Sequence, residues 1–435
     1  MRTFCLITLC FLLVRVVYSQ TSETTVKSYD VKVAVSKTSE FMDVSLKCNI
    51  MVNANNGMLC FLLNQESKVS SISYLRGSEW FSLPFKFTGR DSLLIFPADS
   101  LTSGNLYSLR FEYSLPAGML SDTIMVFDRG NRWYPMIVDQ VAPFRIEALA
   151  PEEYLVLSAG DPISSYTKEN FTSYVWESRT PVFKLPLIIL NSNVIKLKQI
   201  NYKGVNISMY YMTADSAASD ILALSEEAFG YFETAFGNYP YKSLRFVEIP
   251  YFEGINTGSG IIMLGTRSIN DIAKGFSDGL YLSIAQQWIG AGVFAKYGTP
   301  GFWLLSLSLP HYLRLMYIRH AWGEELYNKS LRDPLQNYME FAGKERDIPL
   351  IDITIPDSRE KGIVLYAKGP YVFGRIERQL GADKWSGFIR NLCSICRGKT
   401  LTFEEFKNLL SAYDENGNTL NLLQKLVTGI GIEME

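Results

Sequence analysis

The most informative stretch of the sequence is Leu282-Ser-Ile-Ala-Gln-Gln-Trp-Ile-Gly290. Leu280, Ile284 and Trp288 recur at helical spacing, so we expect a helix over about residues 278–293 with one apolar face buried. A serine and two glutamines interrupt this otherwise apolar segment. Polar residues inside a core helix are typical either of packing or of a functional site. Motifs elsewhere in the chain are needed to distinguish these two interpretations.

The polar positions of this helix match the frame of a zinc-binding motif but not its residues. In the pattern His-Glu-x-x-His, two histidines one helical turn apart reach the same Zn²⁺, and the glutamate acts as general base. The same frame holds Leu282, Ser283 and Gln286. A leucine cannot ligate, a serine hydroxyl is not a base at neutral pH, and an amide is a weak ligand beside imidazole. On these residues alone, packing is favoured over a former metal site.

The N-terminal residues indicate export. The chain has 435 residues, 47% of them hydrophobic, which is enough for two or three domains with large cores. Residues 1–19 have the features of a signal peptide: Arg2, an apolar run over residues 4–14, and small side chains before Gln20. We therefore expect cleavage near Ser19-Gln20 and a secreted or periplasmic protein. The apolar run is too short for a membrane span, and we expect no transmembrane span in the mature chain.

The charge balance excludes one class of partner. Cleavage would remove Arg2 and Arg15, so the 42 basic and 44 acidic residues of the chain would become 40 and 44, a net charge of about −4. No basic patch stands out, and we therefore expect no nucleic-acid binding.

Four cysteines remain after cleavage, Cys48, Cys60, Cys393 and Cys396. An even number in an exported protein permits two disulfides. Cys48 and Cys60 flank residues 53–57, which have the composition of a hairpin turn. The sequence leaves two possibilities open, a disulfide between these cysteines or two free thiols. Cys393-Ser-Ile-Cys396 follows a helical run, which favours a structural or reduced pair over a redox motif.

The periodicity of the chain changes near residue 205. Before it the pattern is that of β-strands separated by Gly, Pro, Asn and Ser. Strands are expected over residues 29–35, 43–52, 58–64, 92–96, 107–113, 154–158, 172–177 and 185–190, and in the second half over residues 244–249 and 261–264. Helices are expected over residues 216–236, 278–293, 303–318, 323–337, 369–380, 383–393, 403–413 and 419–427. The fold class is therefore α+β, with an all-β saddle or sandwich domain over residues 20–205 and a helix-rich domain with a small sheet over residues 206–435.

Five short motifs follow one another along the chain: Arg132-Trp-Tyr-Pro135, Tyr231-Phe-Glu-Thr-Ala-Phe-Gly237, Gly237-Asn-Tyr-Pro240, Pro250-Tyr-Phe-Glu-Gly254 and Tyr366-Ala-Lys-Gly369. In this order they resemble the zinc aminopeptidases related to aminopeptidase N and leukotriene hydrolase. The resemblance covers most of the mature chain. It implies that the second half is the thermolysin-like (gluzincin) peptidase domain and that the C-terminal helical domain of the family is absent.

The resemblance also implies where the metal site of the family would lie. The zinc ligands would fall on Leu282, Gln286 and either Leu305 or Ser306, and the general base on Ser283. None of these residues supplies an imidazole or a carboxylate. We therefore expect no metal site and no cofactor, although the family binds zinc.

The remaining family positions concern the substrate. Tyr366 matches the tyrosine that stabilises the oxyanion and is the only catalytic position retained, but a hydrogen-bonded cleft tyrosine is favoured over residual catalysis. Gly254, Thr257 and Gly260 would line the strand along which a peptide substrate lies, and the acidic anchor for its α-amine is replaced by Thr257.

Other residues offer little replacement chemistry. The only two histidines of the chain, His311 and His320, are nine residues apart on an expected helix, so they would face opposite sides. Ser283 could act as a nucleophile only beside a histidine or lysine, and Lys368 is the nearest candidate.

We therefore expect an exported pseudo-peptidase, an aminopeptidase-like protein that keeps the scaffold and binds a peptide or protein segment in the cleft between its domains without hydrolysing it. Two alternatives stay open. One is an active metallopeptidase or other hydrolase with displaced catalytic residues. The other is a structural surface protein whose cleft is filled by side chains such as Leu282 and Leu305. The sequence indicates no oligomeric state.

Overall fold

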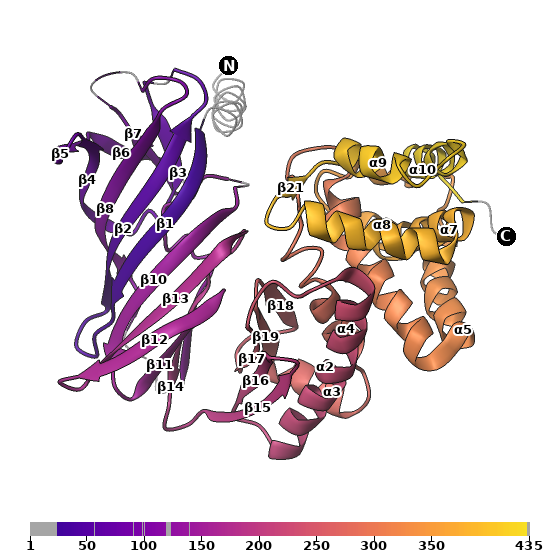
Figure 1. Ribbon diagram of the computed structural model, residues 1–435, viewed down its shortest axis with the longest axis horizontal. Helices are drawn as coiled ribbons and strands as arrows, with labels where there is room; N and C mark the ends of the chain where they lie inside the picture. The colour runs from indigo at the N-terminus through magenta and orange to yellow at the C-terminus, as the bar shows by residue number, and fades with distance from the viewer. Residues whose placement is uncertain are drawn as a thin grey trace. The chain divides into compact units, whose positions relative to one another are not determined.

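The computed structural model describes residues 24–55, 57–89, 91–97, 99, 101–118, 123–138 and 140–432. The expected signal peptide lies outside these residues. The chain divides into two compact units between Lys196 and Leu197 (Figure 1). This division falls earlier than the expected boundary at residues 205 and 206, because β15 (Lys196–Tyr202) is hydrogen-bonded to β16 (Val205–Tyr211) in a sheet of the second unit.

The first unit is built around an eight-stranded sheet (Figure 1). Its strands, in spatial order, are β12 (Asp161–Lys168), β13 (Phe171–Val182), β10 (Ala142–Pro151), β1 (Thr24–Ala34), β2 (Phe41–Val52), β8 (Leu106–Pro116), β4 (Lys68–Arg76) and β5 (Glu79–Ser82). The N-terminal strand β1 lies inside this sheet and pairs in parallel with β10, which follows it by more than a hundred residues. Buried and exposed residues alternate along β2, so one face of the sheet forms the core and the other faces solvent.

Two three-stranded sheets complete the first unit. One contains β11 (Tyr154–Ser158), β14 (Leu187–Asn191) and β9 (Ile124–Phe127), and the other contains β3 (Leu59–Leu62), β7 (Ser92–Ile95) and β6 (Phe85–Thr88). The expected hairpin around residues 53–57 is wrong, because β2 pairs with β1 and β8 whereas β3 pairs with β7. Cys48 and Cys60 therefore lie in different sheets, and both are free thiols.

The second unit contains a five-stranded sheet in the order β15, β16, β17 (Ser243–Ile249), β19 (Ile261–Gly265) and β18 (Ile255–Gly258). The strands β16, β17 and β19 are parallel, and β18 returns antiparallel to β19. In the part of the chain that the structure describes, β18 is thus an edge strand. The helix α2 (Asp215–Phe236) packs on β16, and its buried residues recur at helical spacing, as expected.

Helices make up most of the rest of this unit. They are α3 (Thr266–Ala273), α4 (Asp278–Ala285), α5 (Leu309–Met339), α6 (Arg359–Ile363), α7 (Gly369–Leu380), α8 (Ala382–Ile395), α9 (Phe403–Ser411) and α10 (Asn418–Thr428), with the π-helical segments η1 (Leu304–Ser308) and η3 (Val364–Lys368), the 3₁₀ turn η2 (Leu350–Asp352), and the short pair β20 (Phe294–Ala295) and β21 (Thr400–Leu401). None of the described helices is long and apolar enough to cross a membrane.

The central helix α4 is shorter than expected. It ends at Ala285 rather than near residue 293. The chain then forms turns in which the amide of Ala291 donates to the carbonyl of Gln286 (2.7 Å) and Gly290 adopts a φ of 124°, a conformation open to glycine but not to an α-helix. The glycine therefore stops a segment whose apolar spacing alone would continue the helix.

The Cys393 and Cys396 pair lies at the end of α8 and is buried. Burial raises the pKa of the Cys393 thiol to about 12 and also raises the pKa of Cys396. Both thiols are therefore protonated at neutral pH, which supports the structural interpretation over a redox motif.

A buried carboxylate joins the carboxyl ends of the strands in the second unit. Glu248 on β17 is only 1% exposed. Its Oε2 atom accepts hydrogen bonds from the amides of Met212 (2.7 Å) and Thr213 (3.0 Å), and its Oε1 atom accepts one from Oγ1 of Thr266 (2.7 Å). One side chain thus holds the segment after β16 and the first turn of α3.

The two histidines lie on α5 in different surroundings. His320 is exposed and stacks on Tyr231, with ring centroids 4.7 Å apart. His311 is partly buried, and its Nε2 atom is fully enclosed without a hydrogen-bond partner. Burial, together with the nearby positive charge of Arg314, lowers the pKa of His311 to about 3.

Replacing Glu248 with leucine should lower the free energy of unfolding by about 2 kcal/mol, because two backbone amides lose their acceptor inside the protein. Urea unfolding of the two chains measures this difference. The matched control is Glu345→Leu, at an exposed position, which should change the stability by less than about 0.5 kcal/mol. Equal effects of the two substitutions would contradict the assigned role of Glu248.

The stability of the protein should fall as the pH decreases from about 6.5 to about 3, in part through His311. The unfolded chain binds a proton at this histidine in that window and the folded chain does not, so unfolding is favoured by up to about 3 kcal/mol at pH 4. His311→Phe, which keeps an aromatic ring, should flatten the dependence measured by urea unfolding between pH 4 and 7. His320→Phe is the control and should retain the wild-type dependence.

Candidate functional site

Leu282 and Ser283 of the expected metal motif lie on α4, and Gln286 is the C-cap of that helix. The amide of Gln286 donates to the carbonyl of Leu282 (2.9 Å), so these two residues are one turn apart on the same face of the helix. Ser283 is buried, and its Oγ atom donates to the carbonyl of Gly279 (2.8 Å). A serine bonded to its own helix in this way is satisfied by the backbone and is not activated as a nucleophile. The Nζ atom of Lys368, the candidate partner of Ser283, donates to the carbonyl of Gly429 (2.7 Å).

The third position of the metal motif lies on η1. Leu305 is 2% exposed and contributes to the apolar core, and the Oγ atom of Ser306 is buried without a hydrogen-bond partner. The segment η1 packs against η3, and the Oγ atom of Ser308 donates to the carbonyl of Leu365 (2.7 Å). A Cβ atom on Gly369 would lie 2.1 Å from the Oγ atom of Ser308, so only glycine fits where η3 ends against η1.

The side chains at these positions do not fit a zinc ion. A catalytic zinc needs three donors drawn from imidazole, thiolate and carboxylate groups. Leu282 and Leu305 supply hydrocarbon, Ser283 is bonded within its helix, and Gln286 supplies an amide. Among the described residues, no three His, Cys, Asp or Glu side chains are grouped so that they could hold a metal ion.

Tyr366 lies on η3 and is 48% exposed. Its ring meets the ring of His311 edge to face, with centroids 4.8 Å apart. Partial burial raises the pKa of the Tyr366 hydroxyl, so the group is a neutral donor at physiological pH. π-Helical segments are frequent at functional sites, and neither η1 nor η3 has a signal in the periodicity of the sequence. The contact between Tyr366 and His311 was not expected either.

The three expected substrate positions lie along one hairpin. Gly254 precedes β18 with a φ of 104°, Thr257 is on β18, and Gly260 is in the turn to β19 with a φ of 74°. The amide of Gly265 donates to the carbonyl of Gly254 (2.9 Å). Since hydrogen-bonded and non-hydrogen-bonded pairs alternate in an antiparallel ladder, and Ile255 lies opposite Leu264, the main-chain groups of Ile255 point away from β19.

The turn of this hairpin is fixed by Gln287, one of the two glutamines for which the residues alone favoured packing over a functional site. Its side chain is fully buried, and its Nε2 atom donates to the carbonyl of Gly258 (3.0 Å). Its Oε1 atom accepts from the amide of Gly260 (3.0 Å). The end of the central helix therefore positions the edge strand, and α4 packs directly against β18 (Figure 1).

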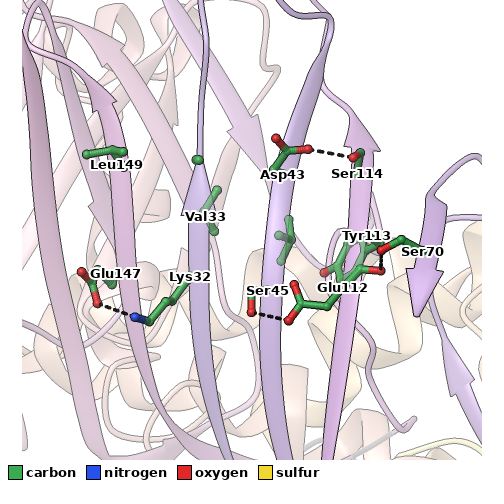
Figure 2. A pocket seen from close by; sticks show the side chains of 12 residues that line it. Lys32, Val33, Asp43, Ser45, Ser70, Glu112, Tyr113, Ser114, Glu147 and Leu149 are labelled. Carbon is green, nitrogen blue, oxygen red and sulfur yellow. Dashed lines mark hydrogen bonds and ion pairs between the residues drawn. The ribbon is translucent and has the colours of Figure 1, made fainter. Parts of the chain in front are cut away.

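A separate groove of about 420 Å³ lies on the solvent face of the eight-stranded sheet (Figure 2). Its polar side chains are paired across neighbouring strands. The Nζ atom of Lys32 lies 3.7 Å from the Oε2 atom of Glu147, and the Oγ atom of Ser45 donates to the Oε1 atom of Glu112 (2.8 Å). Cross-strand pairs of this kind are what a solvated sheet face requires, so the groove is explained without a ligand.

Comparison with known proteins identifies the fold. No protein-family profile matches the chain, and no curated protein matches its sequence. Solved structures do match. The M1 zinc metallopeptidase from Deinococcus radiodurans aligns with a TM-score of 0.74 at 13% identity, covering 95% of each chain. A mutant of that protein bound to a Tyr-Ser-Ala substrate aligns with a TM-score of 0.74 at 14% identity, covering 95% of this chain and 96% of that one.

A two-domain M1 zinc metallopeptidase mutant bound to L-arginine aligns with a TM-score of 0.76 at 13% identity, again covering 95% of this chain and 96% of that one. At these identities the likeness shows the fold. It confirms the expected α+β class, with a β-rich N-terminal unit followed by a helical unit. The chain has the two-domain fold of the M1 zinc metallopeptidases.

Proposed function

We propose that this protein is a non-hydrolysing peptide-binding member of the M1 peptidase fold, and that it adds an extended peptide to the β18 edge. The single observation that carries the proposal is the geometry of this edge. Ile255 turns its main-chain groups outward from a strand whose turn is held by buried hydrogen bonds. An edge of this kind accepts an extended chain through main-chain hydrogen bonds.

The absence of hydrolysis is proposed on the chemistry of four side chains. Peptide hydrolysis by a zinc enzyme needs a metal to polarise the carbonyl and a base to activate water. Leu282, Gln286 and Leu305 do not fit the metal, and Ser283 is not a base. Tyr366 alone supplies one neutral hydroxyl, which can donate a hydrogen bond to a bound peptide.

Two further supports come from outside the site. The solved structures of the same fold hold a Tyr-Ser-Ala substrate in one case and L-arginine in another. The first nineteen residues, with their positive start and apolar run, favour export, so we propose an exported protein that meets peptides outside the cytoplasm.

Tyr-Ser-Ala is the probe for this proposal. The purified protein should bind it in isothermal titration calorimetry. The same mixture, followed by mass spectrometry with and without added zinc, should release no free tyrosine. The D. radiodurans enzyme is the positive control for cleavage. Turnover of the peptide by this chain, retained in His311→Phe and dependent on zinc, would contradict the proposal and would favour a displaced metal site.

Strand addition makes a second prediction that concerns the peptide backbone. A probe methylated on the amide nitrogen of its serine loses a main-chain donor, so its affinity should fall at least about tenfold. The matched control is the isomer with the methyl group on the serine hydroxyl, which has the same mass and keeps the amide. Its affinity should stay within about threefold of the unmodified peptide. Equal affinities of the two isomers would show that the peptide does not bind as a strand.

A further inference from the structure

We propose that Gln287 is the positioning residue of the β18 edge, and that its buried amide sets the register in which a peptide can be added. The inference rests on the proposed function, which supplies the peptide. Gln287 directly follows Gln286, the last position of the expected metal motif on this segment. Its proposed role does not depend on a metal.

The amide of Gln287 acts as a replacement for a backbone segment. It donates to the carbonyl of Gly258 and accepts from the amide of Gly260, each at 3.0 Å, so it bridges the two ends of the turn. The hydroxyl of Tyr239 also approaches its Oε1 atom, at 3.4 Å. Because the side chain is fully buried, water cannot replace these bonds if the amide is removed.

Other elements hold the remaining groups of the same turn. The Oγ atom of Ser259 donates to the carbonyl of Ala291 (2.8 Å), in the turns that follow α4. The carbonyl of Gly260 accepts from the amide of Arg245 (3.1 Å) and from its Nη2 atom (3.0 Å). The turn is therefore fixed from the helix side and from the neighbouring strand, whereas Ile255 and Thr257 stay partly exposed.

The register of the hairpin follows from this turn. In a hairpin the turn fixes which residues face each other, and a slip of one residue reverses which groups point to the edge. Ile255 directs its main-chain groups to this edge only in the observed register. Because β18 has only four residues, its own pairing offers little resistance to a slip. A loosened turn should therefore cost peptide affinity more than it costs the fold.

The test compares two glutamines, one in each unit, whose side chains each bond a backbone amide and a backbone carbonyl. Gln287→Met removes the bridge to Gly258 and Gly260. Gln140→Met removes a similar bridge in the first unit, where the side chain of Gln140 bonds the amide of Val26 and the carbonyl of Thr24. Both substitutions should lower the thermal unfolding temperature. Only Gln287→Met should weaken binding of Tyr-Ser-Ala, at least about tenfold in titration calorimetry.

Hydrogen exchange of residues 255–264 gives a readout that does not need a peptide. In Gln287→Met the amide of Gly260 should exchange faster than in the wild type, and in Gln140→Met it should not. If Gln287→Met does not fold, Ser259→Ala removes one bond from the same turn and should weaken binding about threefold.

The outcomes separate the two proposals. Unchanged affinity in a folded Gln287→Met protein, or unchanged exchange at Gly260, overturns the positioning role. A wild-type chain that binds no Tyr-Ser-Ala overturns the proposed function, and the exchange at Gly260 then decides the positioning role alone. Loss of affinity in both methionine variants would assign the effect to general destabilisation and would also overturn the inference.

Discussion

A single buried amide joins helix to sheet in the second unit. A primary amide carries both a donor and an acceptor, so it can satisfy the two sides of a chain reversal, which neither a carboxylate nor a hydrocarbon can do. Gln287 uses both groups on the glycine turn after β18. The glycine-rich composition of the hairpin agrees with this contact, because the turn must approach the segment after α4 closely.

The elements around the metal-motif positions are held by protein atoms. The crossing of η1 and η3 depends on the hydroxyl of Ser308 and on the missing side chain of Gly369. Leu305, which with Ser306 is one of the two candidates for the third ligand position implied by the resemblance, fills core space. An apolar side chain there needs no partner, whereas a carboxylate without a cation would require desolvation of a charge. The packing of η1 against η3 is therefore explained by contacts between protein atoms.

The sequence predicts most of the elements and little of the site. The strand β11 (Tyr154–Ser158) and the helix α7 (Gly369–Leu380) have the expected bounds, because hydrophobic period and terminating residues agree there. The periodicity did not predict the strand β18, since Ile-Asn-Thr-Gly has a weak strand propensity, and only the resemblance implied a strand there. The π-segments and the contacts of Gln287 depend on residues far away in the sequence. No local pattern indicates them, and only the resemblance to a family pointed to this part of the chain.

The placement of β1 has a consequence for how the first unit is assembled during synthesis. Its neighbours in the sheet are β2, which follows directly, and β10, which is made about a hundred residues later. Until β10 leaves the ribosome, one side of β1 presents open main-chain groups. Sheets with such long-range pairing fold slowly and are exposed to aggregation in the interval. The eight-stranded sheet can therefore be completed only after β10 has been synthesised.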